Sequence, residues 1–249
     1  MTDNDWFFFE ADEWLDKAAS LHEQYTGAEP FPHILFDDFL PEAVTTRLMS
    51  SFPSVNYEGF KQHDNDYQKN KQGRVQENYF RGVDHFVRHM LNEFNGMVFL
   101  DFLERLTGIK GLIGDPHFFG GAMHQILPGG KLDVHADFNY DARRDLDRRI
   151  NVLLYLNQPW QEDWGGHLEL WDKDMSKCHL RAAPLFNRCV IFNTNSSSFH
   201  GHPDPLTCPD GVTRKSIALY YYTVGRDDEP EGMHRTRSIW KKRPQDIEP

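Results

Sequence analysis

The stretch KLDVHADF, residues 131–138, places a histidine and an aspartate, His135 and Asp137, two positions apart in a segment that resembles a strand. Alternate side chains of a strand lie on one face, so both would point the same way. Burying two polar side chains together destabilises a protein unless they find partners. Their ligand atoms could therefore meet at one metal ion. A second HxD at residues 202–204 has a central proline, which favours a turn.

A third ligand is expected from a distant strand. His200 lies a few residues after the candidate strand NRCVIFNT, residues 187–194. Two histidines and one carboxylate form the facial triad typical of non-haem Fe(II) oxygenases, in which three protein ligands leave the opposite side of the ion open. His202, on the same face if the strand continues, and His179 are the alternatives for the second histidine.

The pair His167 and Glu169, an HxE on a candidate strand, offers another metal hypothesis. The residues before it, 164–166, are a tryptophan and two glycines, which indicate a turn leading into a structural strand. We therefore prefer the first pair of ligands.

Open coordination positions require a cosubstrate, and the segment TRKSIALYYYT, residues 213–223, offers a partner for one. Arg214 and Ser216 would share a strand face, where a guanidinium and a hydroxyl suit a carboxylate. The alternative is that Arg214 is a solvated cation at the start of a strand.

The strand RRINVLLYLN would direct a set of alternating side chains inward. Tyr155 belongs to this set and could donate a hydrogen bond to a cosubstrate carboxylate, or could simply be a core tyrosine. The set expected to point inward comprises Arg149, Asn151, Leu153 and Tyr155.

The elements that must position these residues fall into two halves. The first half reads as helices and a short strand, with apolar residues at three- and four-residue spacing. We expect helices at 10–25 and 42–52, one or two helices within 83–107, a strand within 30–41, and a long polar surface loop at 62–82. The second half is a succession of short apolar segments separated by turn residues, which predicts a β-barrel or sandwich.

The predicted organisation is one integrated domain with three parts. Residues 1–110 would pack on the barrel, residues 111–225 would form the catalytic core, and residues 226–249 would be a polar tail that wraps the outside or frays.

The overall charge of the 249 residues is −11, which repels nucleic acid and anionic membranes, so neither is an expected partner. The apolar run near the N-terminus, residues 6–9, is too short for a secretory signal, and no segment approaches a membrane-spanning length. The three cysteines, Cys178, Cys189 and Cys208, include no CxxC pair and suit a reducing cytoplasm.

In order, these motifs resemble a family, the 2-oxoglutarate-dependent Fe(II) dioxygenases, in their prolyl 4-hydroxylase-like branch. The likeness covers most of residues 120–223: an LPGG turn, HADF, a YLN strand end, WGGxLELW, an IFN strand before His200, and TRKS. PFPHILFDDFLP and HRTRSIWKKRP also resemble flanking segments of bacterial members.

The resemblance implies a mainly β fold, a double-stranded β-helix or cupin-like jelly roll flanked by helices. It assigns the iron to His135, Asp137 and His200, and the far carboxylate of 2-oxoglutarate to Arg214. The implied cofactors are Fe(II), 2-oxoglutarate and O2, with ascorbate as a stimulant. The implied reaction hydroxylates an unactivated C–H bond and releases succinate and CO2. Halogenating relatives lack the carboxylate ligand, so the presence of Asp137 favours hydroxylation.

The substrate is expected to be a peptidyl residue, an amino acid or a small metabolite, chosen by the loop at 62–82 and the barrel mouth. Two other classes stay open: a zinc-dependent hydrolase or isomerase on a cupin-like barrel, and a barrel that binds ligands without chemistry. The sequence predicts no oligomeric state.

Overall fold

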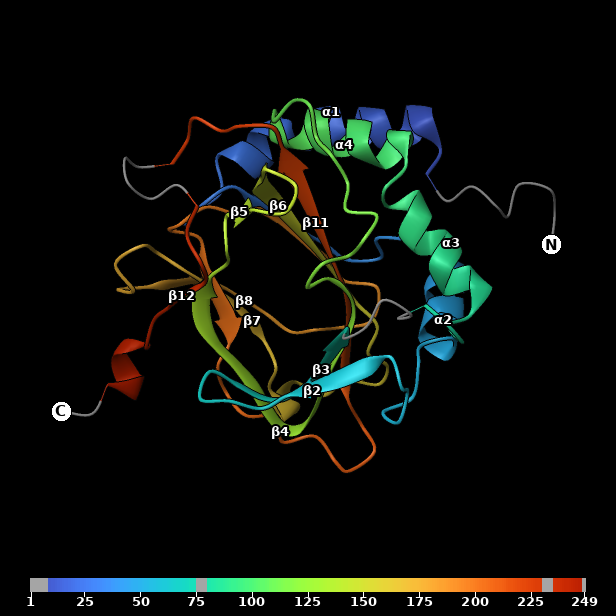
Figure 1. The fold of residues 1–249 in the computed structure, drawn as a ribbon, viewed down its shortest axis with the longest axis vertical. Helices are drawn as coiled ribbons and strands as arrows, with labels where there is room; N and C mark the ends of the chain where they lie inside the picture. The colour runs from blue at the N-terminus through green and yellow to red at the C-terminus, as the bar shows by residue number, and fades with distance from the viewer. Residues whose placement is uncertain (1–8, 75–79, 230–234, 248–249) are drawn as a thin grey trace.

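The computed structural model describes residues 9–74, 80–229 and 235–247, and within them the strands form one curled antiparallel sheet (Figure 1). Residues from several of these strands line a cavity. The main path through the sheet runs β1-β9-β6-β11-β4-β10-β7-β8, and the remaining strands join its margins. The strands are β1 (His33–Phe36), β2 (Phe60–His63), β3 (Gln68–Arg74), β4 (Ala122–Ala136), β5 (Tyr140–Asp141), β6 (Leu146–Tyr155), β7 (Leu168–Trp171), β8 (Cys178–Ala182), β9 (Cys189–Asn193), β10 (Phe199–His202), β11 (Arg214–Thr223) and β12 (Ile239–Trp240).

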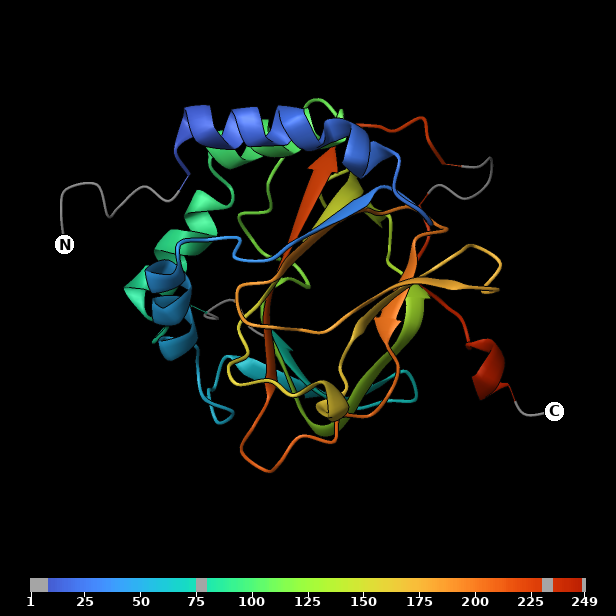
Figure 2. The same cartoon turned by 180° about the vertical axis from the view of Figure 1, so that it is seen from behind.

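Four α-helices lie outside the sheet, close to where the 3.6-residue periodicity predicts them. They are α1 (Ala11–Thr26), α2 (Glu42–Ser50), α3 (His85–Glu93) and α4 (Met97–Thr107), so the segment 83–107 forms two helices. Both views of the fold show α1 and α4 side by side along one end of the curled sheet (Figures 1 and 2). Two short 3-10 helices complete the described elements, at Glu162–Trp164 and Pro244–Asp246.

The strands β6 and β11 separate the hydrophobic core from the cavity. They are neighbours in the sheet, and each presents alternate residues to opposite faces. The face toward the helices packs with Trp14, Phe99 and Phe102 into the main core; it consists of Ile150, Val152, Leu154, Ile217, Leu219 and Tyr221. The opposite face lines the cavity; it consists of Asn151, Leu153, Tyr155, Arg214, Ser216, Ala218 and Tyr220.

Strand β4 is the longest, with fifteen residues, and it contains both the LPGG segment and His135. It pairs with β11 along one edge and β3 along the other, and then with β10 and β12. The LPGG segment, residues 127–130, forms an irregularity in the pairing with β3, where Gly129 has φ 74°. One strand therefore contributes to both halves of the cavity wall.

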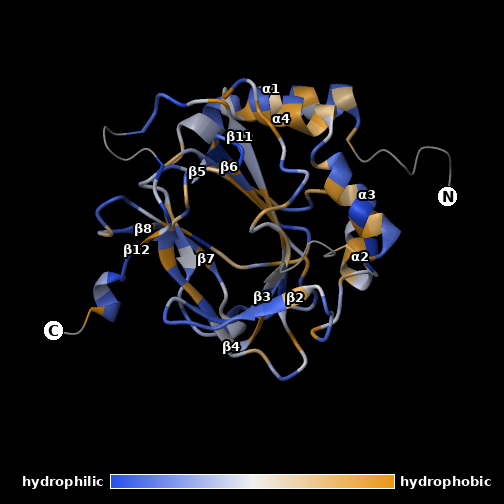
Figure 3. Ribbon diagram, viewed as in Figure 1, coloured by the Kyte–Doolittle hydropathy of each residue, from blue (hydrophilic) through white to orange (hydrophobic). Residues whose placement is uncertain are grey.

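The prediction of a surface loop at 62–82 is wrong for its first half. Residues 60–74 form a β-hairpin, β2 and β3, and β3 adds to the edge of the barrel at β4. The hairpin is mainly hydrophilic (Figure 3), so it lacks the apolar alternation by which a half-buried strand is recognised. Residues 75–79 of the expected loop lie outside the described residues.

Part of the C-terminal tail joins the sheet. β12 pairs with β4, with Ile239 opposite Ala136 and Trp240 opposite His135. Residues 230–234 and 248–249 of the expected tail, and residues 6–8 of the apolar N-terminal run, lie outside the described part of the chain. Among the described helices, none has the length and apolar character to cross a membrane. The division into three parts within one domain stays a prediction.

Candidate metal centre and its cavity

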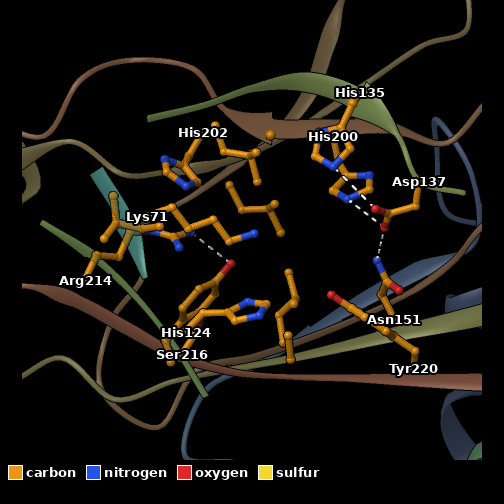
Figure 4. A pocket seen from close by; sticks show the side chains of 17 residues that line it. Lys71, His124, His135, Asp137, Asn151, His200, His202, Arg214, Ser216 and Tyr220 are labelled. Atoms are coloured by element: carbon orange, nitrogen blue, oxygen red, sulfur yellow. Dashed lines mark hydrogen bonds and ion pairs between the residues drawn. The ribbon is translucent and has the colours of Figure 1, made fainter. Parts of the chain in front are cut away.

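His135, Asp137 and His200 come together on one wall of the cavity (Figure 4). The Nε2 atoms of His135 and His200 each lie 3.4 Å from a carboxylate oxygen of Asp137. One ligand atom from each residue lies within 4.8 Å of the others. His200, on β10, pairs directly with His135, on β4, which explains how a distant histidine reaches the HxD segment.

The two histidines are oriented as metal ligands. His135 Nδ1 lies 2.9 Å from the carbonyl oxygen of Asp133, and His200 Nδ1 lies 2.9 Å from the carbonyl oxygen of Ser198. A neutral ring that donates its Nδ1–H to a carbonyl keeps its lone pair on Nε2. Both Nε2 atoms face Asp137, so the donor set of two imidazoles and one carboxylate fits a ferrous ion.

Asp137 is held by two further side chains from β6. Its Oδ2 accepts hydrogen bonds from Arg148 at 2.7 Å and from Asn151 at 2.8 Å. Burial disfavours the charge of Asp137, but Arg148 and the two histidines outweigh it and hold the pKa of the carboxyl well below its usual range. The carboxylate is therefore ionised and fixed in orientation.

The expectation that Arg149 points inward is wrong. In the pairing of β6 with β11, Ile150 lies opposite Tyr221 and Arg148 lies opposite Tyr222, so one extra residue breaks the alternation. Arg149 instead donates to Thr223, and Arg148 takes the inward position. The other three members of the predicted set, Asn151, Leu153 and Tyr155, line the cavity.

A second irregularity turns the metal ligands inward. His200 and His202, two residues apart on β10, pair with His135 and Leu132, three residues apart on β4. The extra residue in β4 is a β-bulge, a feature that re-aims side chains next to active sites. It allows Leu132 and His135 to face the same cavity despite their odd spacing.

Arg214 occupies the opposite end of the cavity from the metal ligands (Figure 4). Its Nε donates to the carbonyl oxygen of Gly166 at 2.7 Å, and its Nη2 donates to the hydroxyl of Tyr155 at 3.3 Å. A Cβ atom at Gly166 would lie 2.9 Å from Arg214 Cδ, so the WGG turn makes room for the guanidinium. Ser216 also lines the cavity, as the shared strand face predicts, whereas Lys215 points away from it.

Burial governs the ionisation of groups at this end. It lowers the pKa of Arg214, with Tyr155 opposing the shift, and raises the pKa of Tyr155, with Arg214 opposing the shift. Burial also lowers the pKa values of His124 and His202 well below the usual range, and the nearby cations Lys71 and Arg214 add to this effect. Both imidazoles are therefore neutral, and the charge of this end is positive.

Several cavity residues do not follow from the sequence pattern. Lys71 enters from β3, inside the segment expected to be a loop, and His124 and Tyr220 come from β4 and β11. Their positions follow from register. Lys71 and Arg214 lie on either side of Ile126, each directly opposite it. A strand assignment for the polar residues 68–74 would have revealed Lys71, but no local signal supports one.

Trp240 also does not follow from the sequence, and it packs directly against a metal ligand. Its ring stacks on His135 with centroids 4.6 Å apart, and Tyr67 stacks on Trp240 with centroids 4.7 Å apart. Because Tyr67 precedes β3 and Trp240 ends β12, this stack joins the hairpin to the tail beside the metal centre.

The alternative ligands do not join the centre. His202 lines the cavity but lies outside the group of converging ligand atoms found among the described residues. His179 faces Asp172, 3.9 Å away. In the HxE pair, Glu169 accepts a hydrogen bond from Trp171 and contacts Arg243.

Comparison with known proteins gives a family match over the core of the chain. Residues 121–222 match the family model of the 2OG-Fe(II) oxygenase superfamily. A curated relative, prolyl 3-hydroxylase OGFOD1 of Mus musculus, is 34% identical over 82 residues, which cover 30% of this chain. The match spans only 14% of the length of that relative.

Solved structures confirm the fold. A Pseudomonas putida prolyl-4-hydroxylase superposes with a TM-score of 0.58 and 19% identity, covering 84% of this chain and 100% of that one. A Trichoplax adhaerens prolyl hydroxylase, in complex with a hypoxia inducible factor peptide fragment, gives a TM-score of 0.59 at 17% identity, covering 89% and 94%. The chain therefore has the double-stranded β-helix fold that the family resemblance implies.

Proposed function

We propose that the chain is an Fe(II)- and 2-oxoglutarate-dependent dioxygenase that hydroxylates an unactivated C–H bond, because residues 121–222 match the family model of the 2OG-Fe(II) oxygenase superfamily. The observation that carries the proposal is the arrangement of one cavity. Three metal-type ligands converge on one wall, and Arg214 lies at the opposite end. When bound, the ferrous ion and 2-oxoglutarate supply the oxidising chemistry that consumes O2 and releases succinate and CO2.

The proposed roles of the chain's residues follow from their positions. His135, Asp137 and His200 hold the metal from one side, and Arg148 with Asn151 keeps the Asp137 carboxylate in its orientation. The opposite side of the metal stays free for the cosubstrate and O2, the open geometry that this ligand set provides.

Arg214, Tyr155 and Ser216 form the proposed binding site for the far carboxylate of 2-oxoglutarate. Arg214 is buried and hydrogen bonded to Tyr155, so its guanidinium is already positioned, and little side-chain entropy is lost on binding. The hydroxyl of Ser216 lines the same wall and adds a donor.

The proposed prime substrate is a peptidyl residue, an amino acid or a small metabolite. The similarity to a prolyl 3-hydroxylase supports a peptidyl residue. The free thiols of Cys178, Cys189 and Cys208 support our proposal of a reducing, cytoplasmic location.

The test measures succinate formed from 2-oxoglutarate by the Fe(II)-loaded protein with ascorbate, with and without O2, across a panel of prolyl peptides, amino acids and small metabolites. We expect O2-dependent succinate and a substrate mass gain of one oxygen atom. His135→Ala and His200→Ala should abolish both, whereas His179→Ala, outside the centre, should retain them. Retained turnover in either ligand variant contradicts the assignment.

The same preparation discriminates the two alternative classes. A zinc hydrolase or isomerase would retain zinc after anaerobic purification and would turn over without O2. A barrel that only binds ligands would bind 2-oxoglutarate without forming succinate under any of these conditions.

A further inference from the structure

Lys71 is a cation that the proposed function does not use. It lies on β3 of the hairpin, and its side chain enters the cavity (Figure 4). In the described part of the chain, its Nζ has neither a hydrogen-bond partner nor a carboxylate partner. Burial lowers the pKa of Lys71 to about 8, Asp137 opposes this shift, and Arg214 and Arg148 add to it. A partly buried ammonium without a partner is unfavourable, and a bound anion would relieve that cost.

The hairpin is shaped to direct Lys71 inward. Asn70 has φ 48°, and its side-chain amide donates to the carbonyl oxygen of Pro128 at 2.9 Å. The pairing with β4 is irregular at this point, so Lys69 and Lys71 do not share an environment. Lys69 is exposed and lies 3.4 Å from Asp64, whereas Lys71 lines the cavity.

The next residue anchors the strand. The amide of Gln72 donates to the carbonyl oxygen of Val55, and its side-chain oxygen accepts a hydrogen bond from Gln125 at 2.8 Å. Gln125 in turn accepts a hydrogen bond from Thr213, the residue before Arg214. This chain of hydrogen bonds fixes β3 relative to β4 and to the start of β11.

Lys71 and Arg214 therefore form a pair across the sheet. Both lie directly opposite Ile126, one on each side of β4, so all three side chains occupy the same face. Their Cα atoms are about two strand spacings, or roughly 10 Å, apart. Two long cationic side chains from these positions can converge on one anion between them. Figure 4 shows both entering the cavity on the side away from His135, Asp137 and His200.

We propose that Lys71 binds the far carboxylate of 2-oxoglutarate together with Arg214, as a second cation of the cosubstrate site. This inference rests on the proposed function, since it takes 2-oxoglutarate as the ligand. The position of Lys71 favours the far carboxylate because the near end of the dicarboxylate belongs at the metal. A carboxylate held by two cations also accounts for a lysine that has no partner of its own.

The test is a calorimetric titration of the Fe(II)-loaded protein under nitrogen with two probes. The first is 2-oxoglutarate, and the second is 2-oxopentanoate, which has a methyl group in place of the far carboxylate. Lys71→Met should weaken 2-oxoglutarate binding by about 10- to 100-fold, the loss expected for one charge-assisted hydrogen bond. It should leave the weaker binding of 2-oxopentanoate unchanged, and Lys71→Arg should restore most of the 2-oxoglutarate affinity.

Lys69→Met is the matched control, because it removes a lysine from the same strand that is exposed and paired with Asp64. It should bind both probes as the unaltered protein does. Equal weakening of both probes by Lys71→Met, or no weakening of either, overturns the inference. If the unaltered protein does not bind 2-oxoglutarate at all, the proposed function fails first. If only Lys71→Met binds 2-oxoglutarate more weakly, while the unaltered protein and Lys69→Met bind it normally, the inference and the proposed function both stand.

Discussion

Trp240 stacks on His135, with ring centroids 4.6 Å apart and an interplanar angle of 28°. One residue is a proposed metal ligand near the middle of the chain, and the other belongs to the two-residue strand β12 near its end. The stack limits rotation of the imidazole by packing against one face of its ring. A hydrogen bond from Nδ1 to the carbonyl of Asp133 fixes the ring in its plane. The two contacts together define the direction of Nε2.

Trp240→Leu should weaken metal binding without removing a ligand. An aromatic pair contributes about 0.5–1.5 kcal/mol, which corresponds to roughly a 2- to 12-fold higher Kd for Fe(II) or Mn(II) by anaerobic titration. Tyr67→Leu, which removes only the outer ring of the stack, should have a smaller effect. An unchanged Kd in Trp240→Leu would show that the hydrogen bond alone orients His135.

Arg148→Met should destabilise the protein and also weaken metal binding. Arg148 is buried, is bonded to Asp137 and Asn151, and lies against the rings of Phe138 and Tyr220. Removing one partner of a buried ion pair leaves the other charge uncompensated, which lowers the free energy of unfolding by about 3–5 kcal/mol.

Arg149→Met is the control for Arg148, since the neighbouring arginine pairs with the partly exposed Asp228. Its loss should lower the free energy of unfolding by less than about 1 kcal/mol in urea denaturation. Equal effects of the two variants would contradict the inward placement of Arg148.

Lys71→Met should stabilise the metal-free protein at neutral pH while weakening cosubstrate binding. The pKa of Lys71 is about 8 in the folded chain, against 10.5 for an ordinary lysine. The unfolded chain therefore binds this proton more tightly, and the protonated form disfavours folding at pH values below about 8. The size of the shift corresponds to about 3 kcal/mol, of which we expect about 1–3 kcal/mol to be recovered by the substitution.

The pH dependence separates this effect from simple packing. As pH rises from 8 toward 10.5, the folded chain loses the Lys71 proton before the unfolded chain does, so the advantage of Lys71→Met over the unaltered protein should shrink progressively and be mostly lost by pH 10. Urea denaturation at pH 7 and pH 10 measures the difference, with Lys69→Met as a control that changes little at either pH. An advantage that is equal at both pH values would point to packing instead.

Asn187→Ala should lower the free energy of unfolding by about 3 kcal/mol or more. Asn187 has φ 60°, and its buried side chain bonds to both backbone atoms of Leu40 and to the hydroxyl of Thr45. It thereby ties the segment between β1 and α2 to the start of β9. Asn187→Gly relieves only the backbone strain, so it should lose roughly 1 kcal/mol less than the alanine variant. Thermal and urea unfolding of both variants test this.

The metal ligands and the flanking helices follow from local pattern. Period-2 alternation is enough to predict the inward direction of three features. They are the HxD on one strand, the histidine after another strand and the arginine that opens a third. The same rule places Tyr155 and Ser216 on the cavity wall, and helical periodicity places Trp14 and Phe102 in the core.

The departures come from two physical sources. A bulge shifts the alternation of β6 by one residue, so Arg148 faces inward where the alternation predicts Arg149. The edge strand β3 is made of polar residues and has no apolar alternation. The sequence pattern therefore predicts neither the hairpin nor the position of Lys71. Trp240 lies in a strand of two residues, which is too short for any period to appear.

The bulge between Leu132 and His135 makes the site depend on chain length as well as residue identity. Deleting one residue there would straighten β4 and send the His135 imidazole toward the other side of the sheet, although every ligand type would remain in the sequence. Single-residue insertions and deletions in this stretch should therefore abolish metal binding as completely as replacing a ligand. A homologue that keeps HxD but has a gap at this point should be read as having lost the centre.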